Sequence, residues 1–205
     1  MEEDGFTLVT NKKRNHKKSN SKNVKILKNS NNKLLIEMPH NLDEIITKYT
    51  MQLKDHSILK RLQGLNLHKN IVCFGIGNMC KADSRYQLAL LRLLSHKNTS
   101  IYDPYTTVPE YDYYINECRF NREVVEDCKK EISEPTLFYM LHCETWMYLA
   151  VIEANKDHLE KIQILGNSFL DLDLACSRQV KLPRFPVYSP FNSTCLMMFD
   201  ETMKK

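Results

Sequence analysis

The chain has 205 residues, 42% of them hydrophobic, which suits one globular domain with a real core. No stretch approaches the roughly 18 to 20 consecutive apolar residues of a membrane-spanning helix, the acidic N-terminus lacks an apolar signal core, and the seven cysteines include no C-x-x-C pair. We therefore expect a soluble intracellular protein without membrane contact, a disulfide framework or a zinc ribbon.

The net charge of +4 is concentrated at the N-terminus. Residues 1–33 hold nine Lys or Arg and three acidic residues, whereas the remaining 172 residues hold 20 basic and 22 acidic ones. Residues 11–33 contain seven asparagines and few large apolar side chains, so they cannot offset the entropy lost on ordering. We predict a disordered basic arm over residues 1–33 and a single α/β domain over residues 34–205. The arm could bind nucleic acid through phosphate contacts or act as a nuclear address, or it is a solubilising tail.

The predicted elements of the domain alternate between helices and strands. In chain order they are helices from about residue 41 and over residues 58–62, a strand at 71–74, a helix opened by residue 83 or 84, a strand at 100–102, a loop followed by a helix over 121–132, a strand at 136–141, a helix over 145–155, a strand at 162–165 and a helix over 170–180. Trp146 and Leu149, with Val151 or Ile152, are expected to face inward. The proline-containing segment from residue 182 ends as an added strand or packs on the surface.

This alternation predicts a three-layer, Rossmann-like α/β domain with a mostly parallel sheet. We expect the strands at residues 71–74, 100–102, 136–141 and 162–165 to lie in the order second, first, third, fourth. That order places the topological switch between the first and third strands.

Each of these four strands stops at residues that are poor in a strand but useful in a ligand site. Because parallel strands share one carboxyl edge, the stops should meet there, where open α/β sheets bind ligands. The candidate ligand-binding residues are Gly75, Gly77, Asn78, Asp103, His142, Asn167 and Ser168.

The first two stops have the types and spacing of a nucleotide site. Gly75 and Gly77 supply two glycines of a G-x-G-x-x-G fingerprint, but Cys80 stands where the third would be, which is against a tight pyrophosphate grip. An anion at the following helix N-terminus, or a plain turn, remains open. Asp103 binds ribose hydroxyls, caps its own loop or pairs with a nearby basic side chain.

The other two stops carry polar side chains without a metal pattern. His142 either contacts a ligand or is a structural histidine, and no H-x-H or H-x-x-x-H spacing accompanies it, so no metal is expected. Adjacent strand residues point to opposite faces, so His142 and Cys143 cannot readily form a base and nucleophile pair, and Asp103 is the better partner. Asn167 and Ser168 donate to a carbonyl or phosphate, or cap the next helix.

Several runs together resemble a known family. They are IVCFGIGN at residues 71–78, SRYQLAL at 84–90, YDP at 102–104, PTLFYMLHC at 135–143 and ILGNSF at 164–169. In order and spacing this combination is similar to the SRR-type family, named for sensitivity to red light reduced, over about residues 60–200. The start, DGFTLVT at residues 4–10, and the end, with Leu182 and Phe191, are similar as well.

One region departs from the family pattern. Members usually carry an extra helix and a short strand before an Asn-Glu-Glu-Gly-Lys-like motif, whereas this chain has a tyrosine-rich stretch and then Asn116, Glu117, Cys118 and Arg119. Whether the sheet lacks a strand there is left open.

The resemblance implies a regulatory rather than an enzymatic protein. It implies a role in clock-gene expression and in the regulation of haem biosynthesis, in a mostly cytoplasmic setting, with no assigned reaction or cofactor. Protein partners and a small-molecule effector are the expected ligands. The alternative is a Rossmann-type nucleotide- or cofactor-binding enzyme, methyltransferase-like, that uses the strand-end site.

Overall fold

The computed structural model describes residues 26–28, 34–36, 38–95, 98–125, 127–168, 176, 178–183 and 190–200. The chain divides into two compact units, Met1–Glu37 and Met38–Lys205. In the first unit, β1 (Ile26–Lys28) and β2 (Leu34–Ile36) pair as an antiparallel ribbon. Most of the predicted basic arm lies outside the described residues, so its disorder stays a prediction.

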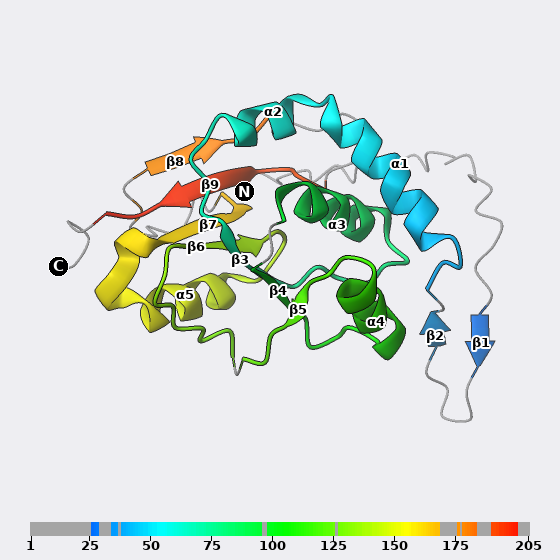
Figure 1. Cartoon of the computed structure of the whole chain (residues 1–205). Helices are drawn as coiled ribbons and strands as arrows, with labels where there is room; N and C mark the ends of the chain where they lie inside the picture. Colours follow the sequence, from blue (N-terminus) through cyan, green and yellow to red (C-terminus); the bar gives the residue numbers. More distant parts are fainter. Residues whose placement is uncertain are drawn as a thin grey trace, which may run out of the picture. The chain divides into compact units, whose positions relative to one another are not determined.

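The second unit is built on a mixed seven-stranded sheet (Figure 1). Its strands are β3 (Asn70–Phe74), β4 (Thr99–Tyr102), β5 (Asn121–Arg122), β6 (Thr136–Met140), β7 (Ile162–Asn167), β8 (Arg178–Lys181) and β9 (Thr194–Met198), in the order β5-β4-β3-β6-β7-β9-β8. Neighbours from β5 to β7 are parallel, and β9 is antiparallel to both β7 and β8. The α/β class and the predicted order of the four main strands are confirmed, but the sheet is mixed.

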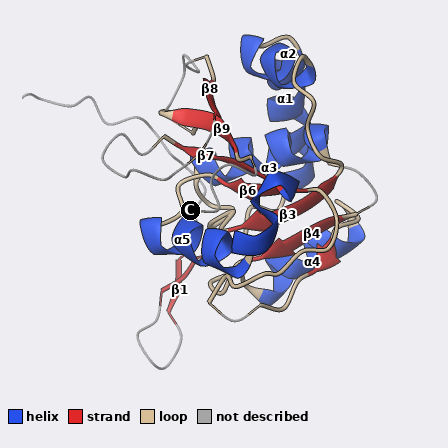
Figure 2. Cartoon of the chain, turned by 90° about the vertical axis from the view of Figure 1, so that its left-hand side faces the viewer, coloured by secondary structure: helices blue, strands red, loops and turns tan. Residues whose placement is uncertain are grey.

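Helices cover both faces of this sheet (Figure 2). They are α1 (Leu42–Lys54), α2 (Ser57–Gln63), α3 (Ala82–Leu94), α4 (Val108–Asn116), α5 (Thr145–Ala154) and the 3₁₀ helix η1 (Lys156–Lys161). Buried residues of α1 to α4 pack in one cluster with Ile71 and Cys73 of β3, whereas α5 and η1 pack in a second cluster with Val72 and Phe74. Alternate strand residues point to opposite faces, so the central strand is covered on both sides. Within the described part of the chain, every helix is too short or too polar to span a bilayer.

The region between β4 and β6 differs from the prediction. A helix, α4, occupies Val108–Asn116, and residues 121–132, predicted as a helix, instead begin with the short strand β5. The N-terminus of α4 is stabilised because the Thr107 N–H donates to Glu110 Oε2 (2.9 Å), and Pro109 lies in the first turn, where no intrahelical N–H is needed. Because tyrosine has little helix propensity, the tyrosines of this stretch gave no signal for a helix. The departure from the family pattern therefore leaves both a helix and a short strand in place.

Three further predictions are corrected. The helix predicted to reach residue 180 is wrong at its end, where Arg178–Lys181 forms β8; residues 169–175 lie outside the described part. The inward face predicted for α5 is confirmed at Val151, which is buried, and wrong at Trp146 and Leu149, which are 49% and 45% exposed. Nearly every residue of α5 is apolar, so periodicity could not select a face. Finally, α3 begins at Ala82, so residues 83 and 84 lie inside its first turn rather than at its cap.

Candidate functional site

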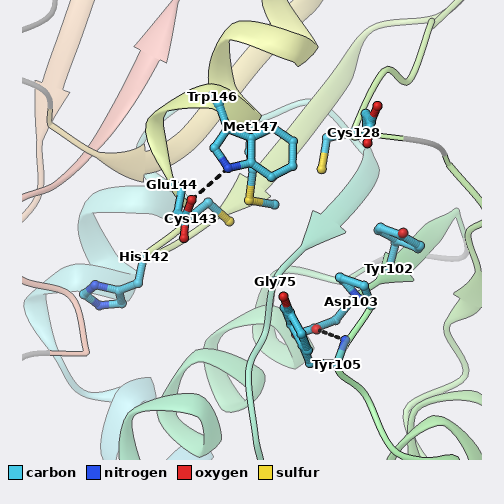
Figure 3. A pocket seen from close by; sticks show the side chains of 12 residues that line it. Gly75, Tyr102, Asp103, Tyr105, Cys128, His142, Cys143, Glu144, Trp146 and Met147 are labelled. Atoms are coloured by element: carbon cyan, nitrogen blue, oxygen red, sulfur yellow. Dashed lines mark hydrogen bonds between the residues drawn. The ribbon is translucent and has the colours of Figure 1, made fainter.

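A cavity of about 450 Å³ lies at the carboxyl ends of β3, β4 and β6. Its lining consists of Gly75, Tyr102, Asp103, Pro104, Tyr105, Asp127, Cys128, His142, Cys143, Glu144, Trp146 and Met147 (Figure 3). The chain runs from β3 outward to β4 and β5 and then returns to β6 on the other side of β3, so the strand order reverses here. The cavity thus occupies the topological switch point, where doubly wound sheets bind their ligands.

The turn after β3 requires its two glycines. Gly75 and Gly77 have φ values of +67° and +80°, in the left-handed region that favours glycine. A Cβ atom on Gly75 would lie 3.0 Å from the Cys143 sulfur, and one on Gly77 would lie 2.7 Å from Ser84 Oγ. The turn passes so close to its neighbours that any side chain would displace them.

Carboxylate oxygens accept hydrogen bonds from two backbone N–H groups of this turn. The Gly77 N–H donates to Asp103 Oδ2 (2.9 Å). The Met79 N–H donates to Glu110 Oε1 (2.8 Å). Both carboxylates are buried. In dinucleotide-binding sheets the N–H groups of the corresponding turn and helix N-terminus face a pyrophosphate, so this geometry is against a phosphate at the turn.

Asp103 connects two loops of the site. Besides the Gly77 N–H, its carboxylate accepts the Tyr105 N–H at Oδ1 (2.9 Å), and the side chain is only 5% exposed. A buried carboxylate with two backbone donors contributes substantially to stability. Asp103 therefore caps its own loop, and it also fixes the turn after β3.

His142 and Cys143 have separate partners. His142 has a φ of +56° and its Nε2 lies 2.9 Å from the Pro190 carbonyl oxygen, so the protonated Nε2 donates there. Its ring is directed away from the other labelled side chains (Figure 3). The Cys143 thiol donates to the Phe74 carbonyl oxygen (3.3 Å). Burial, followed by the nearby Cys128 and Asp103, raises the pKa of Cys143 well above its ordinary range, so the thiol stays protonated.

The remaining candidates support the walls of the site. Asn78 Oδ1 accepts the Cys80 N–H (2.7 Å) within the turn. Asn167 Oδ1 accepts the His142 N–H (2.6 Å), and its Nδ2 donates to the Asn192 carbonyl (3.1 Å). Ser168 hydrogen-bonds through its N–H to the Ser193 carbonyl (2.5 Å).

Of the predicted site residues, the structure brings Gly75, Asp103 and His142 to the cavity lining. The other four, Gly77, Asn78, Asn167 and Ser168, lie in the turns that support the lining. Whether any of the seven binds a ligand stays a prediction.

The aromatic part of the lining was missed. Tyr105 is 92% exposed, and Trp146, the chain's single tryptophan, donates through Nε1 to Glu144 Oε2 (2.8 Å). Both follow a strand stop by two to four residues, and exposed aromatic rings in such positions are typical of ligand contacts. Attention to the residues just after each stop would have found them. Among the described residues, no cluster of three or more His, Cys, Asp or Glu is placed to hold a metal ion.

The comparisons with known proteins agree with the motifs quoted above. The family model described as "SRR1 domain" matches residues 50–198. Protein SENSITIVITY TO RED LIGHT REDUCED 1 of Arabidopsis thaliana is 30% identical over 135 residues, which cover 60% of this chain and 49% of that protein. An SRR1-like protein of Mus musculus is 28% identical over 129 residues, 58% of this chain and 52% of that protein. The chain spans about half the length of these curated relatives. No solved structure matches it. Because the family model covers most of its length, the chain belongs to the SRR1 family.

Proposed function

We propose that this chain is a regulatory protein whose α/β domain binds a small-molecule effector in the cavity at the carboxyl edge of the sheet. The position of the cavity carries the proposal: the ends of β3, β4 and β6 converge on a hollow of about 450 Å³, a size typical of small-molecule sites. The lining combines aromatic, sulfur-containing and carboxylate side chains, as such sites commonly do.

The contacts of the polar residues favour regulation over catalysis. The Cys143 thiol and the His142 ring each contact a backbone carbonyl oxygen, and the Asp103 carboxylate accepts two backbone N–H groups. A nucleophile needs an adjacent base, and here the thiol and the imidazole are directed to different parts of the backbone. The site is therefore better suited to holding a ligand than to transforming it.

The biological setting is part of the proposal. One matched relative is named for reduced sensitivity to red light, and the resemblance of the sequence implies clock-gene regulation and regulation of haem biosynthesis. We extend these roles to this chain. In this proposal protein partners bind its ligand-bound state, and the chain acts in the cytoplasm and also in the nucleus. Because the chain spans about half the length of the relatives, the proposal concerns what this domain contributes.

A second candidate is a methyltransferase-like enzyme, and one observation favours it. The last strand of the chain, β9, lies between β7 and β8 in the sheet and is antiparallel to both. Adenosylmethionine-dependent methyltransferases of the doubly wound type also insert their last, antiparallel strand at this place. A glycine-containing turn after β3 and an acid after β4 agree with such a site, although fold-level analogy alone does not assign a reaction.

The experiment replaces one exposed ring of the lining. Tyr105→Ala removes a side chain that is 92% exposed, so it should leave the fold intact while weakening any ligand contact. Val108→Ala is the matched control, because Val108 is 74% exposed, begins the next helix and does not line the cavity. In cells that depend on this chain, a rhythmic reporter gene should respond to Tyr105→Ala and not to Val108→Ala at equal protein levels.

Two results would contradict the proposal. If Tyr105→Ala leaves the reporter unaffected, the cavity is not an effector site through which the chain regulates. Conversion of adenosylmethionine to adenosylhomocysteine that needs both the purified chain and a methyl acceptor supplied by a cell extract, and that Tyr105→Ala abolishes, would favour the enzyme instead.

A further inference from the structure

The charged residues at the cavity have one dominant sign. Of the described residues that line it, three are carboxylates, Asp103, Asp127 and Glu144, and none is Lys or Arg. Asp103 is buried, whereas Asp127 and Glu144 are exposed. His142 is the one lining residue that could carry a positive charge, and its ring contacts Pro190 instead. The cavity should therefore have a negative potential, which attracts cations and repels anions.

Several backbone N–H groups at the site are already paired within the protein. The N–H groups of Gly77 and Tyr105 donate to Asp103. On the far side, the Met147 N–H donates to the Glu144 carbonyl oxygen (3.0 Å). A phosphate bound at these N–H groups would have to break their hydrogen bonds and approach the buried Asp103 carboxylate, which is unfavourable on both counts.

The remaining lining favours a planar ring. Tyr102, Tyr105 and Trp146 offer aromatic faces, and Met147 adds a polarisable thioether. The Tyr102 and Phe74 rings pack in a T-shaped arrangement, with 6.1 Å between the ring centroids. Aromatic faces bind both planar rings and cationic groups, and a nearby carboxylate strengthens the attraction for a cation.

We propose that the ligand of this cavity is an organic cation with a planar ring and without phosphate. This inference rests on the proposed function, since it assumes that the cavity is the effector site. Each part of the ligand has its own partner: the aromatic rings contact its planar part, and the carboxylates attract its positive charge and repel phosphate.

Trp146 gives a direct measurement of binding, because the chain's single tryptophan lines the cavity. The purified full-length chain is titrated with pairs of compounds that share a ring and differ in charge. One pair is adenosylmethionine, a sulfonium cation, and adenosylhomocysteine, the neutral thioether at the same place. The other is 1-methylnicotinamide, a pyridinium cation methylated on the ring nitrogen, and nicotinamide. ATP supplies the same purine with phosphates.

In at least one pair the cation should change the Trp146 fluorescence saturably and bind roughly tenfold more tightly than its neutral partner, and ATP should have no saturable effect. Asp127→Asn and Glu144→Gln should each weaken cation binding roughly three- to tenfold and leave the neutral compounds unchanged. Asn tolerates the positive φ of Asp127, +50°, and Gln keeps the acceptor for Trp146. Asp157→Asn is the control, since this exposed carboxylate precedes β7 at the opposite edge of the sheet.

The outcomes separate this inference from the proposed function. Equal binding of cation and neutral partner, saturable binding of ATP, or no response to either cation would overturn the ligand class, while a reporter response to Tyr105→Ala would keep the effector site. Conversely, a cation preference without any reporter response would support the ligand class and remove the regulatory role.

Discussion

The two sides of the cavity are built in different ways. On one side, the turn over residues 75–80 is held by the carboxylates of Asp103 and Glu110, which are 5% and 3% exposed. We call this the tied side. On the other, the open side, Tyr105, Asp127 and Trp146 expose their side chains at the mouth. The motif residues that most suggested a ligand contact are thus bonded to the protein itself. The groups free to meet a ligand lie outside the motifs.

The largest effect should come from the tied side. Asp103→Ala leaves the Gly77 and Tyr105 N–H groups without their acceptor, so we expect it to lower the free energy of unfolding by about 3 kcal/mol. Asp103→Asn, which keeps one acceptor oxygen, should cost less. Urea denaturation followed by circular dichroism measures both. Asp112→Ala, at an exposed position of α4, is the control and should stay within about 0.5 kcal/mol of wild type. An unchanged stability for Asp103→Ala would contradict the structural role that distinguishes the tied side from the open side.

The second prediction concerns the backbone of the tied turn. Gly77→Ala places a Cβ at φ +80° and 2.7 Å from Ser84 Oγ, so we expect a loss of about 2 kcal/mol. Ser84→Ala in the same chain should recover only part of that loss, because the positive φ remains. A double-mutant cycle with the two single variants separates the contact from the backbone strain. Complete recovery in the double variant would show that the contact alone requires glycine.

The third prediction tests how well the protein shields the Cys128 thiol, which lines the cavity, from solvent. Burial, followed by the nearby Asp127, raises the pKa of Cys128 to about 11 from its ordinary 9.0. Between pH 9 and 11 the unfolded chain has released a proton that the folded chain still holds, so stability falls as pH rises through this window. Cys128 should contribute about 1 kcal/mol per pH unit to that slope.

Unfolding measured at several pH values in this window checks the contribution. Cys128→Ala should make the pH dependence shallower than in wild type. Val125→Ala, which also alters a buried side chain of this loop but removes no titrating group, should lower stability and keep the slope. The same slope in Cys128→Ala as in wild type would mean that Cys128 titrates as it does in the unfolded chain.

The smallest effect should come from the mouth of the open side. Tyr105→Ala removes a ring that is 92% exposed and leaves the Tyr105 N–H bond to Asp103 in place. We expect a change in the free energy of unfolding within about 0.5 kcal/mol. Thermal unfolding of the variant measures this directly. A loss comparable to that of Asp103→Ala would mean that the ring has a structural role and that the two sides do not differ.

Much of the fold could be predicted because its signals are local. The apolar runs at residues 71–74, 136–141 and 162–165 are bounded by glycine or polar residues, and each is a strand. The helical spacing of Leu42, Ile46 and Leu53 likewise marks α1. In contrast, α4 was missed because its tyrosines have little helix preference and its signal, the Thr107 and Glu110 capping pair, is short.

The candidate site could be located more surely than its residues could be assigned. That the strand stops at residues 75–78, 103–104 and 142–144 would meet follows from parallel pairing, and the cavity lies there. The roles of the residues at these stops did not follow from the sequence. Asp103 has the type and position of a ribose ligand, yet its oxygens accept N–H groups from its own loop and from a turn 26 residues earlier.

The sequence by itself determined the alternation of helices and strands, the order of the central strands and the edge at which the strands stop. Burial periodicity and strand-breaking residues are properties of short segments, so they can be read without knowing what lies nearby. Only the tertiary structure decided that Asp103 and Glu110 hold the turn after β3, that the His142 ring faces Pro190, and that Trp146 lines the cavity. These are contacts between segments distant in sequence, and a polar side chain takes the partner that folding brings closest.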